Sequence, residues 1–295
     1  MSANPIVAAT DGSEESLRAV EWAAREAVLR GAPLRIVSAA AMPPRMTADH
    51  ATPSDHATSS DYDTVADVIT KGSDRGLQAA SDRAAKTAPG LLIDADHLDG
   101  PPAEAVVQSG SGALMLVVGS RGVGGFAALI LGSVSRYAAT HASCPVVVVR
   151  EADEGAQRQV GIGVGDLEHA EASLTFAFEE AAVRKASLIV VHAWHMPESD
   201  ISRAGEALAT PGLHGIEEKA TAQLEQALND WRARYPGVQV SHDVVHGHPG
   251  RALVGLSART DLVVIGRRAA HHGPGSVTHA VLSHAHGPVA TVPTD

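Results

Sequence analysis

Short, continuous apolar runs alternate along this chain with longer segments in which apolar residues recur at helical spacing. Residues 6–11, 34–38 and 113–118 are such runs, and their length and composition predict buried parallel strands. Residues 14–30 and about 64–87 have the helical spacing. This succession of strand, helix and strand predicts a parallel sheet that is covered by helices.

The second half of the chain repeats the plan of the first. A predicted strand at 160–166 ends in an aspartate, as the run at 6–11 does. It is followed by a predicted helix at 168–184 and a predicted strand at 188–192. Repetition of this kind indicates two domains of the same fold.

Corresponding residues of the two halves keep a nearly constant separation. Asp11 and Asp166 are 155 residues apart, and Gly119 and Gly266 are 147 apart, so the duplication is collinear with small changes in length. We therefore expect an α/β fold of two tandem doubly wound domains, each with a mainly parallel sheet of five strands and helices on both faces. A polar stretch between the halves places the domains at residues 1–151 and 158–295.

Composition narrows the class of protein. The chain is 44% apolar but only 3% aromatic, so aliphatic side chains form its cores. A formal net charge of −11 argues against nucleic acid or an anionic membrane surface as a partner. The single cysteine excludes an internal disulfide framework, and the sequence shows neither a membrane-spanning run nor a signal peptide. We expect a cytoplasmic protein.

The most informative stretch begins where the strand at 113–118 ends. It contains Gly119 and Gly122 and then, after nine further residues, Gly132 followed by Ser133. Glycines let backbone N–H groups approach an anion closely, and Ser133 can begin a helix whose positive end faces the same anion. This predicts a phosphate cradle, although an ordinary turn would explain the first two glycines alone. The stretch is neither a P-loop nor a dinucleotide-binding fingerprint.

This glycine spacing resembles the ATP-binding signature of the universal stress protein family, and residues 144–149 resemble that family's last strand. Two such halves resemble the tandem universal stress proteins of actinobacteria, whose domains have an adenine-nucleotide α-hydrolase-like fold. The resemblance implies ATP or another adenine nucleotide with Mg²⁺, and a role in stress response or signalling. It places the nucleotide of the first half against Ala9, Thr10, Asp11, Ala39, Gly119, Arg121, Gly122, Gly132, Ser133, Val134 and Ser135.

Two charged residues of this set have simpler interpretations. Asp11 can accept hydrogen bonds from a ribose hydroxyl or help to hold Mg²⁺, but aspartate at this position is also a common helix cap. The resemblance favours the nucleotide. Arg121 can reach a phosphate, although an arginine in a surface loop is more often simply solvated.

The second half departs from the signature. Ala269 stands where the second glycine is expected, and Gly275 follows Gly266 by 9 residues, whereas Gly132 follows Gly119 by 13. We expect altered or weaker nucleotide binding here, and the alternative is a domain that is kept for packing alone. The resemblance implies that the nucleotide of the second half would lie against Asp166, Gly266, Gly275, Ser276 and Val277. Arg267, Arg268 and His271 would supply further charge there.

Two segments raise the possibility of a metal site. Residues 42–63 predict an irregular loop that contains Asp49, His50, Asp55 and His56. Near the end of the sequence are His271, His272, His279, His284 and His286, which could also form a pH-sensitive patch. Neither segment has standard ligand spacing, so we expect a solvated loop and exposed histidines.

Three function classes remain. The leading one is an ATP-binding regulator with slow hydrolysis at most, because the chain lacks a P-loop lysine and the glycine stretch supplies no general base. An adenylylating enzyme would need an acceptor pocket, for which the sequence has no motif. A nucleotide-free interaction scaffold would use the glycines only for turns.

The last strands of the two halves, at 144–149 and 288–292, are predicted sheet edges, which favour pairing. The resemblance implies that such strands pair, which would join the two domains within one chain. Dimerisation of whole chains is a further possibility.

Overall fold

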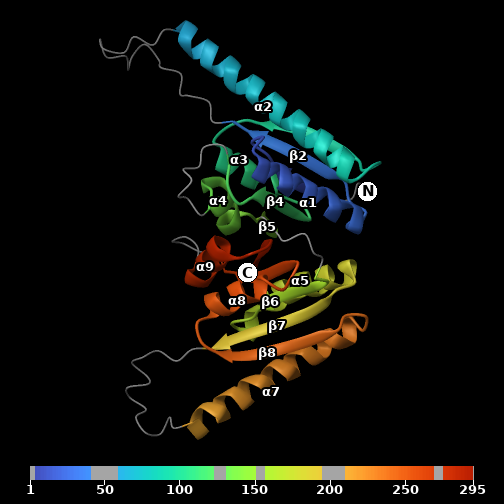
Figure 1. The fold of residues 1–295 in the computed structure, drawn as a ribbon, viewed down its shortest axis with the longest axis vertical. Helices are drawn as coiled ribbons and strands as arrows, with labels where there is room; N and C mark the ends of the chain where they lie inside the picture. Colours follow the sequence, from blue (N-terminus) through green and yellow to red (C-terminus); the bar gives the residue numbers. More distant parts are fainter. Residues whose placement is uncertain are drawn as a thin grey trace, which may run out of the picture. The chain divides into compact units, whose positions relative to one another are not determined.

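The computed structural model describes residues 4–40, 59–122, 131–150, 157–194, 210–268 and 275–294 (Figure 1). The chain divides into two compact units, Met1–Cys144 and Pro145–Asp295. Within the described residues, no helix combines the length and the apolar character that crossing a membrane requires.

The first unit is a parallel sheet with helices on both faces. Its elements are β1 (Ile6–Ala9), α1 (Glu14–Arg30), β2 (Leu34–Ala39), α2 (Ser59–Thr87), β3 (Ile93–Leu98), α3 (Pro102–Ser109), β4 (Met115–Gly119) and α4 (Ser133–His141). The strand order is β3-β2-β1-β4, and all three pairings are parallel. Because crossovers are right-handed, α1 and α2 cover one face and α3 and α4 the other (Figure 1).

Local signals set the bounds of α1. The Ser13 side chain caps its first turn by accepting a hydrogen bond from the Ser16 N–H, and Gly31 ends it in the left-handed conformation. The inward face is aliphatic and contacts strands β1 and β4, which are buried along their whole length. The aliphatic core expected from the composition is therefore present in this unit.

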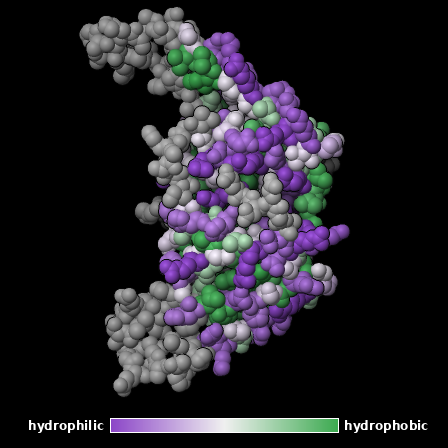
Figure 2. All heavy atoms as spheres, viewed as in Figure 1, coloured by the Kyte–Doolittle hydropathy of each residue, from purple (hydrophilic) through white to green (hydrophobic). Residues whose placement is uncertain are grey.

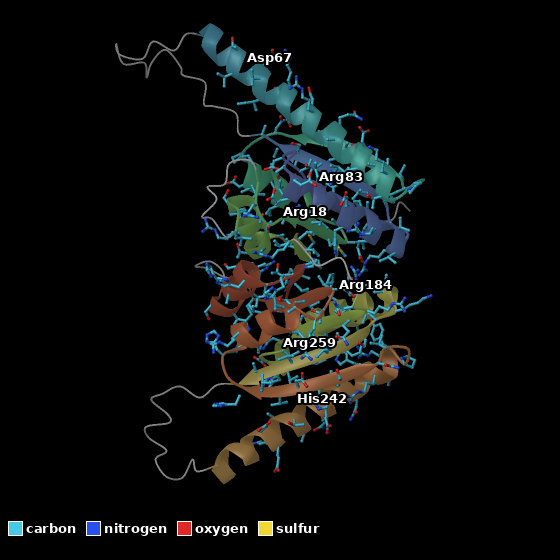
Figure 3. The ribbon with its side chains drawn as sticks, viewed as in Figure 1. Arg18, Asp67, Arg83, Arg184, His242 and Arg259 are labelled. Atoms are coloured by element: carbon cyan, nitrogen blue, oxygen red, sulfur yellow. The ribbon has the colours of Figure 1, made fainter. Side chains whose placement is uncertain are left out.

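Two features hold α2 against the rest of the first unit. Arg83 donates hydrogen bonds from Nη2 to Glu14 and from Nε to Glu21, at 2.6 and 2.5 Å (Figure 3). Gly12 and Gly76 meet backbone to backbone, because a Cβ on Gly76 would lie 3.2 Å from the Gly12 Cα. The N-terminal part of α2 extends beyond these contacts, and Val65 and Val68 are exposed there. Figure 2 shows a green group of apolar side chains near this end of the helix.

The second unit repeats this architecture. Its elements are β5 (Val146–Val149), β6 (Gln159–Gly163), η2 (Leu167–His169), α5 (Glu171–Arg184), β7 (Ser187–Trp194), α7 (Thr210–Arg234), β8 (Val240–His246), α8 (Pro249–Ser257), β9 (Leu262–Arg267), α9 (Ser276–His284) and β10 (Val289–Pro293). Five strands, in the order β10-β9-β6-β7-β8, run parallel. Strand β5 pairs antiparallel with β10, with Val148 opposite Val289. The predicted pairing of the two last strands is thus observed.

Stacked aromatic rings fasten α7 to α5 in the second unit. The ring of Phe178, which is fully buried, lies 5.4 Å from that of Trp231 and 5.3 Å from that of Tyr235. Phe178, Trp231 and Tyr235 thus anchor the long helix α7 to α5.

The predicted fold class is confirmed, and the bounds of three predicted elements are corrected. The helix expected at 168–184 is a 3₁₀ turn, η2, followed by α5, because the Asp166 carboxylate caps the turn by accepting a hydrogen bond from the Glu168 N–H. The strand expected at 160–166 ends at Gly163. Helix α2 begins at Ser59, a few residues before its expected start.

Candidate functional site

The site predicted in the first unit lies where the strand order reverses. Strand β1 has β2 on one side and β4 on the other, and the helices that follow β1 and β4 cover opposite faces. In open α/β sheets, ligands bind at such a point, outside the carboxyl ends of the strands. The residues that follow these three strands, Thr10, Ala40 and Ser120, therefore share one edge of the sheet.

The turn after β1 holds Asp11 in a fixed orientation. Asp11 Oδ1 accepts hydrogen bonds from Ser13 N and Ser13 Oγ, at 3.0 and 2.6 Å. Thr10 is buried, and its hydroxyl is 3.0 Å from that of Ser16. The helix-cap interpretation of Asp11 is therefore wrong, because Ser13 caps α1 and Asp11 braces the cap.

The structure brings Asp11 and Gly122 together. A Cβ on Gly122 would overlap Asp11 Oδ2, so glycine is the residue that fits here while Asp11 keeps this orientation. Residues more than a hundred positions apart in the chain thus meet at the edge of the sheet.

Gly119 has a packing role. A Cβ there would lie 2.9 Å from the carbonyl carbon and oxygen of Glu15 and 3.0 Å from the Ser16 nitrogen. The Gly119 carbonyl accepts a hydrogen bond of 2.5 Å from the buried Ser135 hydroxyl. Gly119 and Ser135 thus join the end of β4 to α1 and α4, and the Ser135 proton is already donated to the backbone.

Helix α4 presents its N-terminus to the same edge. Its N-cap is Gly132, so no side chain caps this end, and Ser133 is exposed. The Gly132 N–H donates to the Ser120 carbonyl at 2.8 Å, while the amides of the following residues, including half-buried Val134, begin the helix. An uncapped helix start carries unsatisfied N–H groups and a partial positive charge, both of which attract anions.

The other residues predicted for this site lie at its border. Ala9 is 9% exposed at the end of β1, and Ala39 is partly exposed at the end of β2. Arg121 is exposed and lies 3.5 Å from a Glu15 carboxylate oxygen, so it is paired within the protein. Glu15 was not predicted as a residue of this site. It lies beside Arg121 because α1 packs against β4.

A chain of hydrogen bonds beside the site was also missed. Ser38, in β2, is 2.9 Å from the Ser73 hydroxyl, which is 3.1 Å from His97 Nδ1. His97 Nε2 is 2.7 Å from an Asp74 oxygen. Gly76, in the middle of a predicted helix, was a signal of the close approach of α2 to the loop after β1, because glycine is unfavourable there without a packing reason.

The corresponding edge of the second unit has different chemistry. Asp166 Oδ2 accepts hydrogen bonds from Arg268 Nη2 at 2.6 Å and from His169 Nδ1 at 2.9 Å, and Oδ1 accepts one from Glu168 N at 3.1 Å. The His169 and Glu168 hydrogen bonds lower the pKa of Asp166 from its ordinary value, with a smaller contribution from the Arg268 charge. Asp166 is therefore an ionised carboxylate that already has a cation beside it.

Cavities surround this carboxylate. One of about 310 Å³ is lined by Asp166, His169, Arg268 and Gly266, among others. Another of about 210 Å³ is mainly apolar and includes Val277. Gly275 caps α9 without a side chain, no described atom lies within 4 Å of its Cβ position, and Ser276 is exposed beside it. Of the residues predicted for the second site, Asp166, Gly266 and Val277 therefore line cavities. Ala269 and His271 are outside the described residues.

A wide cleft also separates α7 from the loop after β6. Its volume is about 780 Å³, and Leu167, Glu168, His192 and Gln223 line it. In the first unit, the loop after β1 touches α2 directly through Gly12. The two units therefore differ in how this long helix meets the first loop of the sheet.

Neither metal hypothesis gains support from the described residues. Across the described ranges, no group of three or more histidine, cysteine, aspartate or glutamate side chains is placed to hold a metal ion. On α9 and just after it, His279, His284 and His286 are exposed. The other candidates, Asp49, His50, Asp55, His56, His271 and His272, are outside the described residues.

Comparison with known proteins identifies the family. The model of the universal stress protein family matches residues 3–150 and again residues 157–293. A universal stress protein of Mycobacterium tuberculosis H37Rv is 33% identical over 302 aligned positions, which cover 96% of this chain and 95% of the relative. One of Mycolicibacterium smegmatis is 32% identical, with 97% and 92% covered. The crystal structure of a universal stress protein from Archaeoglobus fulgidus covers both chains completely with a TM-score of 0.66 and, at 17% identity, supports the fold. The chain therefore belongs to the universal stress protein family, with two tandem family domains.

Proposed function

We propose that this protein is an adenine-nucleotide-dependent regulator of the stress response in the cytoplasm, and that its first unit binds ATP with Mg²⁺. The phosphates would lie at the N-terminus of α4, against the amides of Ser133 and Val134. Asp11 would face the ribose or the metal ion, and the ends of β1 and β2 would border the base. Because the described residues hold no group of three or more side chains placed to bind a metal ion, Mg²⁺ would be held mainly by phosphate oxygens and water.

Gly132 is the observation that carries this proposal. Its backbone, with φ of −69° and ψ of 156°, is accessible to any residue. Among described atoms, the nearest to its Cβ position are 3.5 Å away, which is ordinary contact. Neither this conformation nor packing against the described residues explains a glycine where serine or aspartate would cap the helix better. A phosphate that approaches the backbone closely does explain it.

The same geometry argues against rapid hydrolysis. Lys71 and Lys86 are the only lysines in the first 150 residues, and both are on α2. Lys71 is paired with Asp67 at 2.6 Å, and Lys86 is in the last turn of α2. Backbone amides hold phosphates in the ground state but stabilise the transition state little more. We propose that ATP acts as a bound signal, with slow hydrolysis at most.

Gly132→Ser tests the proposal. The serine hydroxyl has room to accept hydrogen bonds from the first amides of α4, so it would cap the helix and occupy the phosphate position. We expect unchanged or slightly higher stability together with loss of nucleotide binding. Gly275→Ser, at the same position of α9, is the matched control and should leave ATP binding by the first unit intact.

The measurement has two parts. Nucleotide released from the denatured wild-type protein is separated and quantified per chain, and binding of added Mg-ATP is measured by calorimetry. Adenylate in the wild type that disappears in Gly132→Ser supports the proposal. If the wild type carries no nucleotide and binds none on addition, the nucleotide function is wrong and an interaction scaffold becomes the better explanation.

A further inference from the structure

The carboxyl edge of the second unit contains two adjoining cavities with different chemistry. The apolar cavity of about 210 Å³ lies among the ends of β6, β7 and β9 and the starts of α8 and α9. The polar cavity of about 310 Å³ contains the side chains of Asp166, His169 and Arg268. Gly163 to Gly165 and Gly266 line both, so one ligand can occupy both cavities. The pair suits a ligand with an apolar ring at one end and an anion at the other.

The Asp166 carboxylate is already coordinated by protein donors. Arg268, His169 and the Glu168 amide each donate a hydrogen bond to it, at 2.6, 2.9 and 3.1 Å. A divalent cation would have to displace the Arg268 guanidinium, whose positive charge also repels it. This edge is therefore built for an anion and not for a metal ion.

The ion pair itself is easily exchanged. The side chains of Arg268 and Asp166 are 63% and 43% exposed, and pairs exposed to this degree contribute little to stability. A phosphate can replace the carboxylate as the partner of Arg268, because a guanidinium binds either group through paired N–H donors. Asp166, once released, has oxygens that can accept hydrogen bonds from hydroxyls.

We propose that the second unit binds a nucleoside monophosphate without Mg²⁺, by exchanging the Asp166–Arg268 ion pair for an Arg268–phosphate pair. The base enters the apolar cavity, and Asp166 accepts hydrogen bonds from the ribose hydroxyls. The Arg268 guanidinium is the one arginine or lysine group among the described residues that line the two cavities, and a single guanidinium matches one phosphate better than three. This inference rests on the proposed function in taking the ligand to be a nucleotide.

The test uses the full-length Gly132→Ser protein, in which the cradle of the first unit is blocked. AMP is titrated by calorimetry in EDTA and again in excess Mg²⁺. We expect about one AMP per chain and the same affinity in both solutions. Arg268→Met should lower the affinity about tenfold or more, because a charge-assisted pair is lost. Arg268→Lys should fall between, since it keeps the charge without the paired donors.

Arg259→Met is the matched control. Arg259 (labelled in Figure 3) donates a hydrogen bond of 3.2 Å to Asp243 in the same unit. Arg259 precedes β9 in the chain, whereas Arg268 follows β9. This variant also breaks an exposed arginine–aspartate pair, and it should bind AMP as the parent does. Circular dichroism of each variant verifies that the fold is kept.

Three results would overturn the inference: no AMP binding by the Gly132→Ser protein, a requirement for Mg²⁺, or unchanged affinity in Arg268→Met. Each leaves the proposed function standing if the wild-type protein still binds Mg-ATP at its first unit. Failure of the proposed function is different, because the wild type would then bind no adenine nucleotide at all.

Discussion

Replacing Gly119 by alanine is expected to destabilise the first unit. The new Cβ would lie 2.9 Å from two backbone atoms of Glu15 and 3.0 Å from the backbone nitrogen of Ser16. These atoms belong to the first turn of α1 and cannot rotate away as a side chain would. Either α1 or the end of β4 must move, and the Ser135–Gly119 hydrogen bond would be strained as well.

The size of the effect follows from this overlap. Overpacking in a closely packed region costs about 1–3 kcal/mol. In a domain of about 150–250 residues, 1 kcal/mol shifts the midpoint of thermal unfolding by about 2–4 °C. We therefore expect Gly119→Ala to lower the midpoint of the first unit by roughly 2–12 °C.

Two other glycines of the first unit provide graded controls. Gly72 lies within α2 and has no atom within 4 Å of its Cβ position, so Gly72→Ala should stabilise the unit by about 0.5–1 kcal/mol through helix propensity. Gly76 is also in α2, but its Cβ would be 3.2 Å from the Gly12 Cα. Gly76→Ala should therefore fall between Gly72→Ala and Gly119→Ala.

The assay must separate the two units, because they need not unfold together. Native-state hydrogen exchange read by mass spectrometry gives the opening free energy of β1 and β4 separately from that of β6 and β9. The expected destabilisation is refuted if the amides of β1 and β4 are as well protected from exchange in Gly119→Ala as in the wild type. It is also refuted if Gly72→Ala destabilises the unit as much as Gly119→Ala.

Three further predictions concern packing and charge. Gly161→Ala should destabilise the second unit by about 1–3 kcal/mol, because its Cβ would lie 2.6 Å from a Leu256 methyl carbon. In urea unfolding, the double variant with Leu256→Ala should lose less free energy of unfolding than the sum of the losses in the two single variants. The pKa of Asp166 is lowered from its ordinary value of 3.8, chiefly by the His169 hydrogen bond. The ionised Asp166 carboxylate therefore stabilises the folded unit at pH values above 3.8, and this stabilisation is lost as the pH falls through the lowered pKa. Asp166→Asn should therefore make the unfolding midpoint less sensitive to acid, and an unchanged acid limb would contradict this. Arg83→Met should lower the thermal midpoint slightly at low salt, because two ion pairs to α1 are lost, and the difference should shrink at high salt.

Elements with strong local signals could be predicted from the sequence. The bounds expected for α1 agree with the structure because a capping serine and a glycine with positive φ enclose it. The repeat predicted two units of one fold, and the apolar runs predicted their buried strands. The 3₁₀ turn after β6 was not predicted, because its cap is an aspartate side chain that competes with helical hydrogen bonding over a few residues.

The surroundings of the site glycines could not be predicted from the sequence. The glycine spacing singled out Gly119, Gly122 and Gly132 together, yet the structure gives them different positions. Gly119 lies against the backbone of α1, Gly122 lies against Asp11, and Gly132 caps α4 in ordinary contact with the described atoms around it. The motif indicates that small residues are needed at these positions. It does not indicate which neighbouring atoms each glycine packs against.

The sequence by itself determined the α/β class, the duplication and the edge of the sheet at which a ligand site is expected, because hydrophobic periodicity and helix caps act over a few residues. The tertiary structure decided the surroundings of the two equivalent aspartates: Asp11 hydrogen-bonds to its own turn beside Gly122, whereas Asp166 is held by Arg268 from the end of β9. Arg268 is about a hundred positions from Asp166, and its guanidinium reaches the carboxylate because parallel pairing brings the ends of β6 and β9 together. Local patterns cannot encode such a contact, since its energy depends on a distance that exists only in the folded chain.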